Sequence, residues 1–128
     1  LHCKLISYGV DYIILAGFLL KIPKAMISLY KNKILNIHPS LLPKYGGKGM
    51  FGENVHRAVL ENKETVSGIS IHLVNENYDK GRILFQKSCL IYPVDTIDSL
   101  SKKITSLEHS FFAKTIEKYI KDENNHIY

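Results

Sequence analysis

Cysteine is scarce in this sequence, and the way it is used excludes several classes of protein. Cys3 and Cys89 lie far apart, with neither a C-x-x-C pair nor a Cys/His spacing typical of zinc ligands. No helical stretch carries H-x-x-x-H, so we expect no bound metal. The cysteines therefore predict neither a disulfide framework nor a metal centre, and they favour a reducing cytoplasm.

Long apolar runs are also missing. No stretch approaches the roughly 20 residues that span a bilayer, and no signal peptide precedes the first predicted strand, so a membrane partner is not expected. The sequence has no G-x-S-x-G elbow and no cysteine beside a base, which leaves covalent catalysis without a nucleophile.

Acidic residues are outnumbered by basic ones. Lysine and arginine together number 17 against 12 acids, a net charge of +5, which favours anionic partners such as phosphates, polyglutamates or nucleic acid. No repeat of aromatic and basic residues marks a nucleic-acid surface, so we expect no nucleic-acid partner and interpret most of the charge as a solvated surface. Nucleic-acid binding stays a minor alternative.

The residues that are present predict one α/β domain over 1–128. Hydrophobic residues make up 45% of the 128 positions, enough for a real core. A strand over 10–15, a helix from Pro23 to Asn32 and a strand over 33–37 form a βαβ unit, which calls for a right-handed crossover. The prediction is an open, mostly parallel, Rossmann-like sheet with flanking helices.

The second half of the chain adds an antiparallel hairpin to this sheet. We predict a helix over 54–62, strands over 65–74 and 82–91, and a last helix that begins at Thr96 or Asp98. Asn54 is a candidate N-cap of the first of these helices, and the tail 121–128 is expected to be frayed.

The stretch from Asn36 to Gly49 is the one around which the chain is organised. It joins the end of an apolar run to a loop whose prolines and glycines exclude helix and strand, so polar side chains emerge where the strand ends. Asn36 and His38 are separated by one apolar residue and should lie on the same face. An amide donor beside an imidazole suits oxyanion stabilisation and proton transfer, although the same pair is common as a turn cap.

Other polar residues have weaker signals. Asp79 is the candidate acid, because its turn follows the strand that ends at Val74, on the same predicted rim; turn chemistry is the alternative. His56 and His72 either line the crevice or pack in the core. The run Gly46-Gly47-Lys48-Gly49 is interpreted as a flexible flap rather than a phosphate loop, because it lacks the P-loop serine or threonine.

Five segments together resemble phosphoribosylglycinamide formyltransferase, the folate-dependent enzyme of purine synthesis. They are Leu-Ala-Gly-Phe at 15–18, Asn-Ile-His-Pro-Ser-Leu-Leu-Pro at 36–43, Ser-Gly-Ile-Ser-Ile-His-Leu-Val at 67–74, Tyr-Asp-Lys-Gly at 78–81 and Leu-Glu-His at 107–109. The resemblance implies the formyltransferase fold, and transfer of a formyl group from the co-substrate 10-formyltetrahydrofolate to the amine of glycinamide ribonucleotide, without a metal.

The resemblance also implies roles for individual residues. Asn36 would hydrogen-bond the formyl oxygen, His38 would stabilise the oxyanion and move a proton, and Asp79 would orient His38. Pro39 and Glu108 would contact the ribonucleotide. The pterin would be held, largely through backbone groups, by Phe18, Leu19, Leu20, Lys21, Ile22, Val74, Asn75, Glu76, Asn77 and Tyr78.

The match to this family starts only near Val10. The family's phosphate-binding loop, in an N-terminal βα region, has no counterpart, and residues 1–9 read as the tail of a helix stopped by Gly9. We therefore expect the N-terminally incomplete portion of such an enzyme, with its own missing N-terminal portion as a partner. Two alternatives are a formyltetrahydrofolate hydrolase-like enzyme and a non-catalytic folate-binding remnant.

Overall fold

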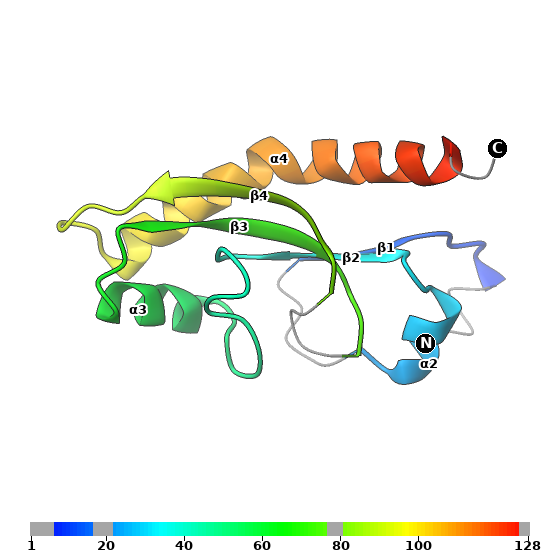
Figure 1. Ribbon diagram of the computed structural model, residues 1–128, viewed down its shortest axis with the longest axis horizontal. Helices are drawn as coiled ribbons and strands as arrows, with labels where there is room; N and C mark the ends of the chain where they lie inside the picture. Colours follow the sequence, from blue (N-terminus) through cyan, green and yellow to red (C-terminus); the bar gives the residue numbers. More distant parts are fainter. Residues whose placement is uncertain (1–6, 17–21, 77–80, 126–128) are drawn as a thin grey trace.

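The protein is built around a four-stranded mixed sheet (Figure 1). The structure is a computed structural model that describes residues 7–16, 22–76 and 81–125. The strands lie in the order β1-β2-β3-β4. Their bounds are Ile13–Ala16 (β1), Ile34–His38 (β2), Val66–Leu73 (β3) and Ile83–Leu90 (β4), and those of the helices are Lys24–Leu29 (α2), Glu53–Glu61 (α3) and Ile97–Asn125 (α4).

The pairing of the strands corrects one prediction. β1 and β2 are parallel, as the βαβ unit requires, but β2 with β3 and β3 with β4 are antiparallel. Among the described strands the sheet is therefore mostly antiparallel, and the prediction of a mostly parallel sheet is wrong. The short helix α3 is the reason: it packs beyond the carboxyl end of β2, so the chain re-enters the sheet from the end at which β2 leaves it.

The predicted elements are all present, with shifted ends. α2 ends at Leu29, before the predicted Asn32. The N-cap of α3 is Gly52 rather than Asn54, whose side chain instead donates a hydrogen bond to the Gly49 carbonyl, 3.0 Å away. The predicted hairpin of β3 and β4 is confirmed.

The last helix begins after a reciprocal cap. The backbone N–H of Thr96 donates to Ser99 Oγ at 2.8 Å, and the N–H of Ser99 donates to Thr96 Oγ1 at 3.1 Å. Of the two predicted start residues, Thr96 therefore caps the helix and Asp98 lies in its first turn. The helix continues to Asn125, into the segment that was expected to be frayed.

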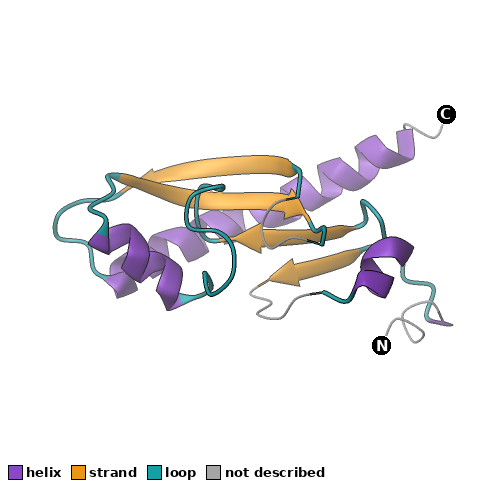
Figure 2. Cartoon of the chain, turned by 60° about the horizontal axis from the view of Figure 1, so that its bottom comes forward, coloured by secondary structure: helices purple, strands orange, loops and turns teal. Residues whose placement is uncertain are grey.

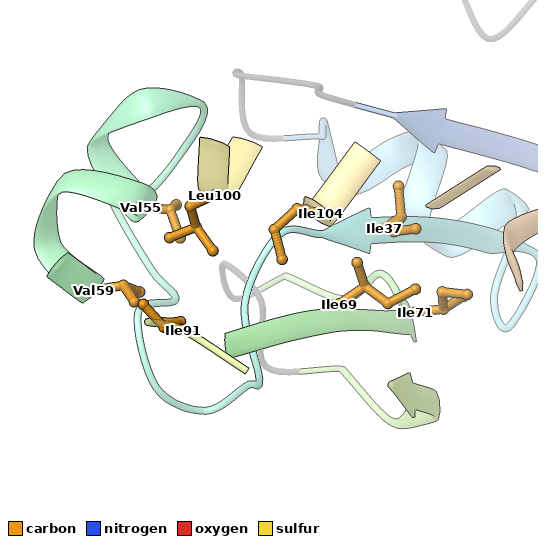
Figure 3. Close-up of a cluster of buried hydrophobic side chains, with 8 residues drawn as sticks. All are labelled: Ile37, Val55, Val59, Ile69, Ile71, Ile91, Leu100 and Ile104. Carbon is orange, nitrogen blue, oxygen red and sulfur yellow. The ribbon is translucent and has the colours of Figure 1, made fainter. Parts of the chain in front are cut away.

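The main core joins α3, α4 and one face of the sheet. Figure 3 shows its buried side chains: Ile37, Val55, Val59, Ile69, Ile71, Ile91, Leu100 and Ile104. A second cluster packs α2 against the other face through Ile22, Met26, Tyr30 and Ile34. The helices α4 and α2 thus cover the two faces of the sheet (Figure 1). Burial of each large aliphatic side chain between a helix and the sheet stabilises the fold by about 1.5–3 kcal/mol.

The first strand lies at an edge of the sheet and is only partly covered. Its residues alternate between half-buried and exposed, and Ile14 remains 39% exposed. Within the described residues, β1 pairs with β2 alone. In that same part of the chain, no helix is long and apolar enough to cross a membrane.

Candidate active site

The candidate catalytic pair lies on the face of β2 that is turned away from α4. Leu35 and Ile37 pack into the clusters that contain Tyr119 and Ile104 of α4. Because side chains alternate along a strand, Asn36 and His38 project to the opposite face, as the sequence predicts. Figure 2 shows α4 behind the strands and the loop that follows β2 on the near side.

Asn36 is held by a histidine on the neighbouring strand. Asn36 Nδ2 lies 3.2 Å from Nε2 of His72, its cross-strand partner, and His72 Nδ1 lies 3.0 Å from the Leu73 carbonyl. A carbonyl only accepts, so Nδ1 carries the hydrogen and Nε2 of the neutral ring accepts from the Asn36 amide. One N–H of Asn36 remains available, and its buried Oδ1 has no hydrogen-bond partner among the described residues.

His38 ends β2 and is enclosed by the loop that follows. The ring is 4% exposed, and its Nε2 donates a hydrogen bond of 2.7 Å to the backbone carbonyl of Tyr45. This bond places a hydrogen on Nε2, so Nδ1 carries the lone pair whenever the ring is neutral. The backbone of the loop therefore sets the tautomer of the candidate proton carrier.

A third histidine approaches the site from α3. His56 is buried, and its Nδ1 has no hydrogen-bond partner in the described part of the chain. Burial lowers the pKa of His56; Glu53 opposes this effect and the nearby His38 adds to it. His56 therefore favours the neutral form beside His38.

Several residues expected to bind the pterin lie outside the described residues. These are Phe18, Leu19, Leu20, Lys21, Asn77 and Tyr78, together with the candidate acid Asp79.

The rest of the expected pterin site is described. Ile22 is buried in the cluster around α2, and the N–H of Val74 donates to the Ile34 carbonyl at 2.8 Å. Asn75 and Glu76 are exposed.

The two residues expected to contact the ribonucleotide come from different layers. Pro39 directly follows His38 and is half-buried. Glu108 lies on α4, behind the sheet, where burial raises the pKa of its carboxyl and the neighbouring His109 lowers it.

Sequence reasoning left two residues of this site without a role. His72 holds Asn36, and Ser70 lies directly opposite His38 on β3. The signal was present in the sequence: both are polar residues at alternate positions of an otherwise apolar strand, which places them on one face. Their contact with β2 depends on the strand register, which the sequence alone does not give.

One cavity near the site has a different lining. Its volume is about 330 Å³, and it is lined by Leu41, Pro43, Lys44, Tyr45, Val59, Glu64, Val66 and Ser67, none of which was predicted to bind substrate. No group of three or more histidine, cysteine or acidic residues in the described ranges is arranged to hold a metal ion. Among the described residues, the site offers an amide N–H, an amide oxygen without a hydrogen-bond partner and an imidazole of fixed tautomer.

An amide and a histidine at the end of a strand of a mixed α/β sheet agree with one class of protein, the formyl transferases. The chain belongs to the formyl transferase family, whose family model matches residues 1–116.

Among curated relatives, the chain is 46% identical over 110 residues to a chloroplastic phosphoribosylglycinamide formyltransferase of Arabidopsis thaliana, covering 86% of this chain and 38% of the relative. It is 35% identical over 109 residues to phosphoribosylglycinamide formyltransferase of Escherichia coli strain K12, covering 85% of this chain and 49% of that protein. The crystal structure of phosphoribosylglycinamide formyltransferase from Bacillus halodurans superposes with a TM-score of 0.84 at 31% identity, over 91% of this chain and 58% of that one. The chain thus spans about half the length of these relatives.

Proposed function

We propose that this chain carries the catalytic part of a phosphoribosylglycinamide formyltransferase of purine biosynthesis. The reaction transfers a formyl group from 10-formyltetrahydrofolate, as a folate co-substrate of one-carbon metabolism, to the primary amine of glycinamide ribonucleotide. The observation that carries the proposal is the anchored amide of Asn36 beside His38: among the described residues it keeps one N–H for a ligand, and its Oδ1 has no hydrogen-bond partner. Membership of the formyl transferase family supports it.

The arrangement suits an amine that attacks a formyl carbon. Attack places negative charge on the formyl oxygen, and the remaining N–H of Asn36 is the donor for that charge. Loss of one such donor costs about 3–4 kcal/mol, or about a hundredfold to a thousandfold in rate. Oδ1 of Asn36, which has no partner in the part of the chain that the structure describes, is a suitable acceptor for a hydrogen of the incoming amine.

His38 is assigned the proton transfer. Its Nε2–H is committed to Tyr45, so Nδ1 of the neutral ring takes up the proton that leaves the attacking nitrogen. The imidazolium that results stabilises the oxyanion through its positive charge. As the tetrahedral carbon collapses, its bond to the folate nitrogen breaks, and His38 Nδ1 gives the proton back to that leaving nitrogen. Asp79 is proposed to orient His38 and to pair with its charge.

Substrate contacts complete the proposal. The segments 18–22 and 74–78 would bind the pterin, largely through backbone groups. Pro39 would contact the glycinamide end and Glu108 the ribose hydroxyls. A half-buried carboxyl whose pKa is raised by burial can still accept hydroxyl hydrogens, because its oxygens keep acceptor capacity in both protonation states.

Partners and location are proposals as well. Because the chain spans about half of its relatives, the missing N-terminal portion of the family's fold is the proposed partner, and it would supply the phosphate-binding loop. The proposed compartment is the cytoplasm. The word chloroplastic in the name of the Arabidopsis relative makes a plastid the competing location, and cell fractionation decides between the two.

The test is an assay that separates transfer from hydrolysis. The full-length protein is incubated with 10-formyltetrahydrofolate, with and without glycinamide ribonucleotide, and tetrahydrofolate, formate and formylated ribonucleotide are measured. The proposal predicts tetrahydrofolate only in the presence of the amine, in equal amount to formylated product. Formate released without the amine would identify a hydrolase, and binding of folate without turnover would identify a non-catalytic remnant.

A further inference from the structure

A row of polar side chains crosses three strands of the sheet beside the candidate site. His38 on β2, Ser70 on β3 and Gln86 on β4 are direct cross-strand partners, so they lie on one face. Ser70 is fully buried, whereas Gln86 comes from the exposed surface of the edge strand β4. The row thus connects His38 with the edge of the sheet.

Ser70 and Gln86 fix the loop that follows His38. The Ser70 hydroxyl donates to the Ser40 carbonyl at 2.7 Å and accepts from the N–H of Leu42 at 2.9 Å. Gln86 Nε2 donates to the Leu42 carbonyl and to Ser70 Oγ, both at 2.9 Å. Both N–H groups of the Gln86 amide and all three hydrogen-bonding positions of the Ser70 hydroxyl are therefore used to hold residues 40–42.

The fixed loop ends at the group that sets the tautomer of His38. Ser40 Oγ donates to the Lys44 carbonyl at 2.7 Å, and the N–H of Lys44 lies 3.2 Å from the Leu41 carbonyl, so residues 40–44 form a closed turn. The next carbonyl, that of Tyr45, accepts the hydrogen bond from His38 Nε2. A shift of the turn therefore moves the acceptor of His38.

We infer that Gln86 is a positioning residue: through Ser70 and Leu42 it holds the turn so that Tyr45 keeps the hydrogen of His38 on Nε2. It acts at a distance from the reacting atoms, because its contacts are with the turn and with Ser70. This inference rests on the proposed function only for its effect on rate. Its effect on the His38 ring is independent of the reaction.

Two substitutions at this position separate hydrogen bonding from packing. Gln86→Met keeps the length of the side chain but removes both donors, so Ser70 and the Leu42 carbonyl each lose a bond. Gln86→Lys keeps N–H donors within reach of both acceptors. Ser88→Ala is the matched control, because Ser88 is an exposed residue of the same strand.

The experiment uses the full-length protein with ¹⁵N-labelled histidine. We measure the tautomer and hydrogen exchange of His38 by NMR, kcat and KM for formyl transfer, and the unfolding midpoint. For Gln86→Met we expect faster exchange of the His38 Nε2 hydrogen and a kcat lowered about tenfold, with KM within twofold of the parent, because a small misplacement of a catalytic group reduces the rate of the chemical step. Gln86→Lys should bring the exchange of the His38 Nε2 hydrogen and the kcat most of the way back to the parent values. Ser88→Ala should change neither quantity.

Each result decides something. Unchanged His38 exchange and kcat in folded Gln86→Met would overturn the inference, as would a loss that Gln86→Lys fails to restore. If the parent protein transfers no formyl group but His38 exchange responds as expected, the proposed function fails and the positioning role stands.

Discussion

At the scale of single residues, the site depends on one amide and the histidine that holds it. Asn36 donates to His72 Nε2, and this contact requires that His72 be neutral with its hydrogen on Nδ1. The remaining N–H of Asn36 then has a fixed direction, which is what an oxyanion donor requires. We therefore predict that removal of His72 lowers the rate of the proposed formyl transfer through its effect on Asn36.

His72→Phe tests this anchoring. The variant keeps a ring of similar size but removes the acceptor for Asn36 Nδ2, so we expect kcat to fall about tenfold to a hundredfold in the full-length protein. His72→Gln keeps an acceptor and should lose less. Steady-state kinetics of both variants check this, and an unchanged kcat in His72→Phe would show that the contact is irrelevant to the reaction.

His56 provides a prediction on pH. Burial lowers the pKa of His56 in the folded state below its ordinary value of about 6.5, so near that pH the unfolded chain binds the extra proton and the folded chain does not. The stabilisation from neutral His56 is therefore complete above the unfolded pKa and is lost as the pH falls below it.

The measurement is urea unfolding between pH 5 and 7.5. We expect His56→Gln to reduce the dependence of the free energy of unfolding on pH in this interval, and Ser110→Ala, at an exposed position of α4, to leave it unchanged. Identical pH dependence in the parent and in His56→Gln would contradict the buried neutral state.

At the scale of elements, the strands β3 and β4 and the turn after β2 approach one another closely at Gly68. A Cβ atom at Gly68 of β3 would overlap the Lys87 carbonyl of β4 and lie 2.7 Å from Leu41 Cδ2. Leu41 belongs to the turn that follows His38, so this position joins the pairing of β3 and β4 to the turn beside the site. Only a residue without a side chain fits there.

Gly68→Ala should therefore destabilise the fold. Overpacking of this kind costs about 1–3 kcal/mol, because the β4 backbone or Leu41 has to move. Thermal unfolding checks the loss, with Ser106→Ala at an exposed position of α4 as the control. A melting temperature equal to that of the parent would mean that the two strands separate without cost.

The elements also show what the sequence could predict. The periodicity of apolar residues predicts every described helix and strand. The strands β1, β2 and β3 are rich in β-branched residues, β4 begins with an apolar run, and α4 presents a buried stripe that includes Leu100 and Ile104. The direction of β3 was not predictable in this way, since it depends on α3 packing beyond the end of β2. Asn36 and His38 were found from their spacing, whereas His72, Ser70 and Gln86 depend on cross-strand register, which no local pattern encodes.

At the scale of the whole molecule, β1 presents an incomplete edge. Its described residues pair with β2 alone, and Ile14 is exposed on the strand. A flat strand edge with apolar side chains favours pairing with another chain. An edge of this kind agrees with our proposal that the N-terminal portion of the family's fold is the partner of this chain.

The edge yields a prediction for residues 1–128 expressed alone. We expect them to self-associate in analytical ultracentrifugation, and Ile14→Lys to reduce the association, because a charged residue on an edge strand opposes pairing. Ala113→Lys, at an exposed position of α4, should have no effect. If the parent chain is a monomer at all concentrations, the edge needs no partner.

The most direct test of the central claim is the kcat of formyl transfer in full-length Asn36→Asp. This change replaces the N–H donor with a second oxygen at nearly constant shape, and Asn124→Asp, on an exposed turn of α4, is the matched control. We predict a kcat reduced about a hundredfold to a thousandfold in Asn36→Asp and unchanged in Asn124→Asp. A parental kcat in correctly folded Asn36→Asp would contradict the assignment of Asn36 as the donor to the oxyanion.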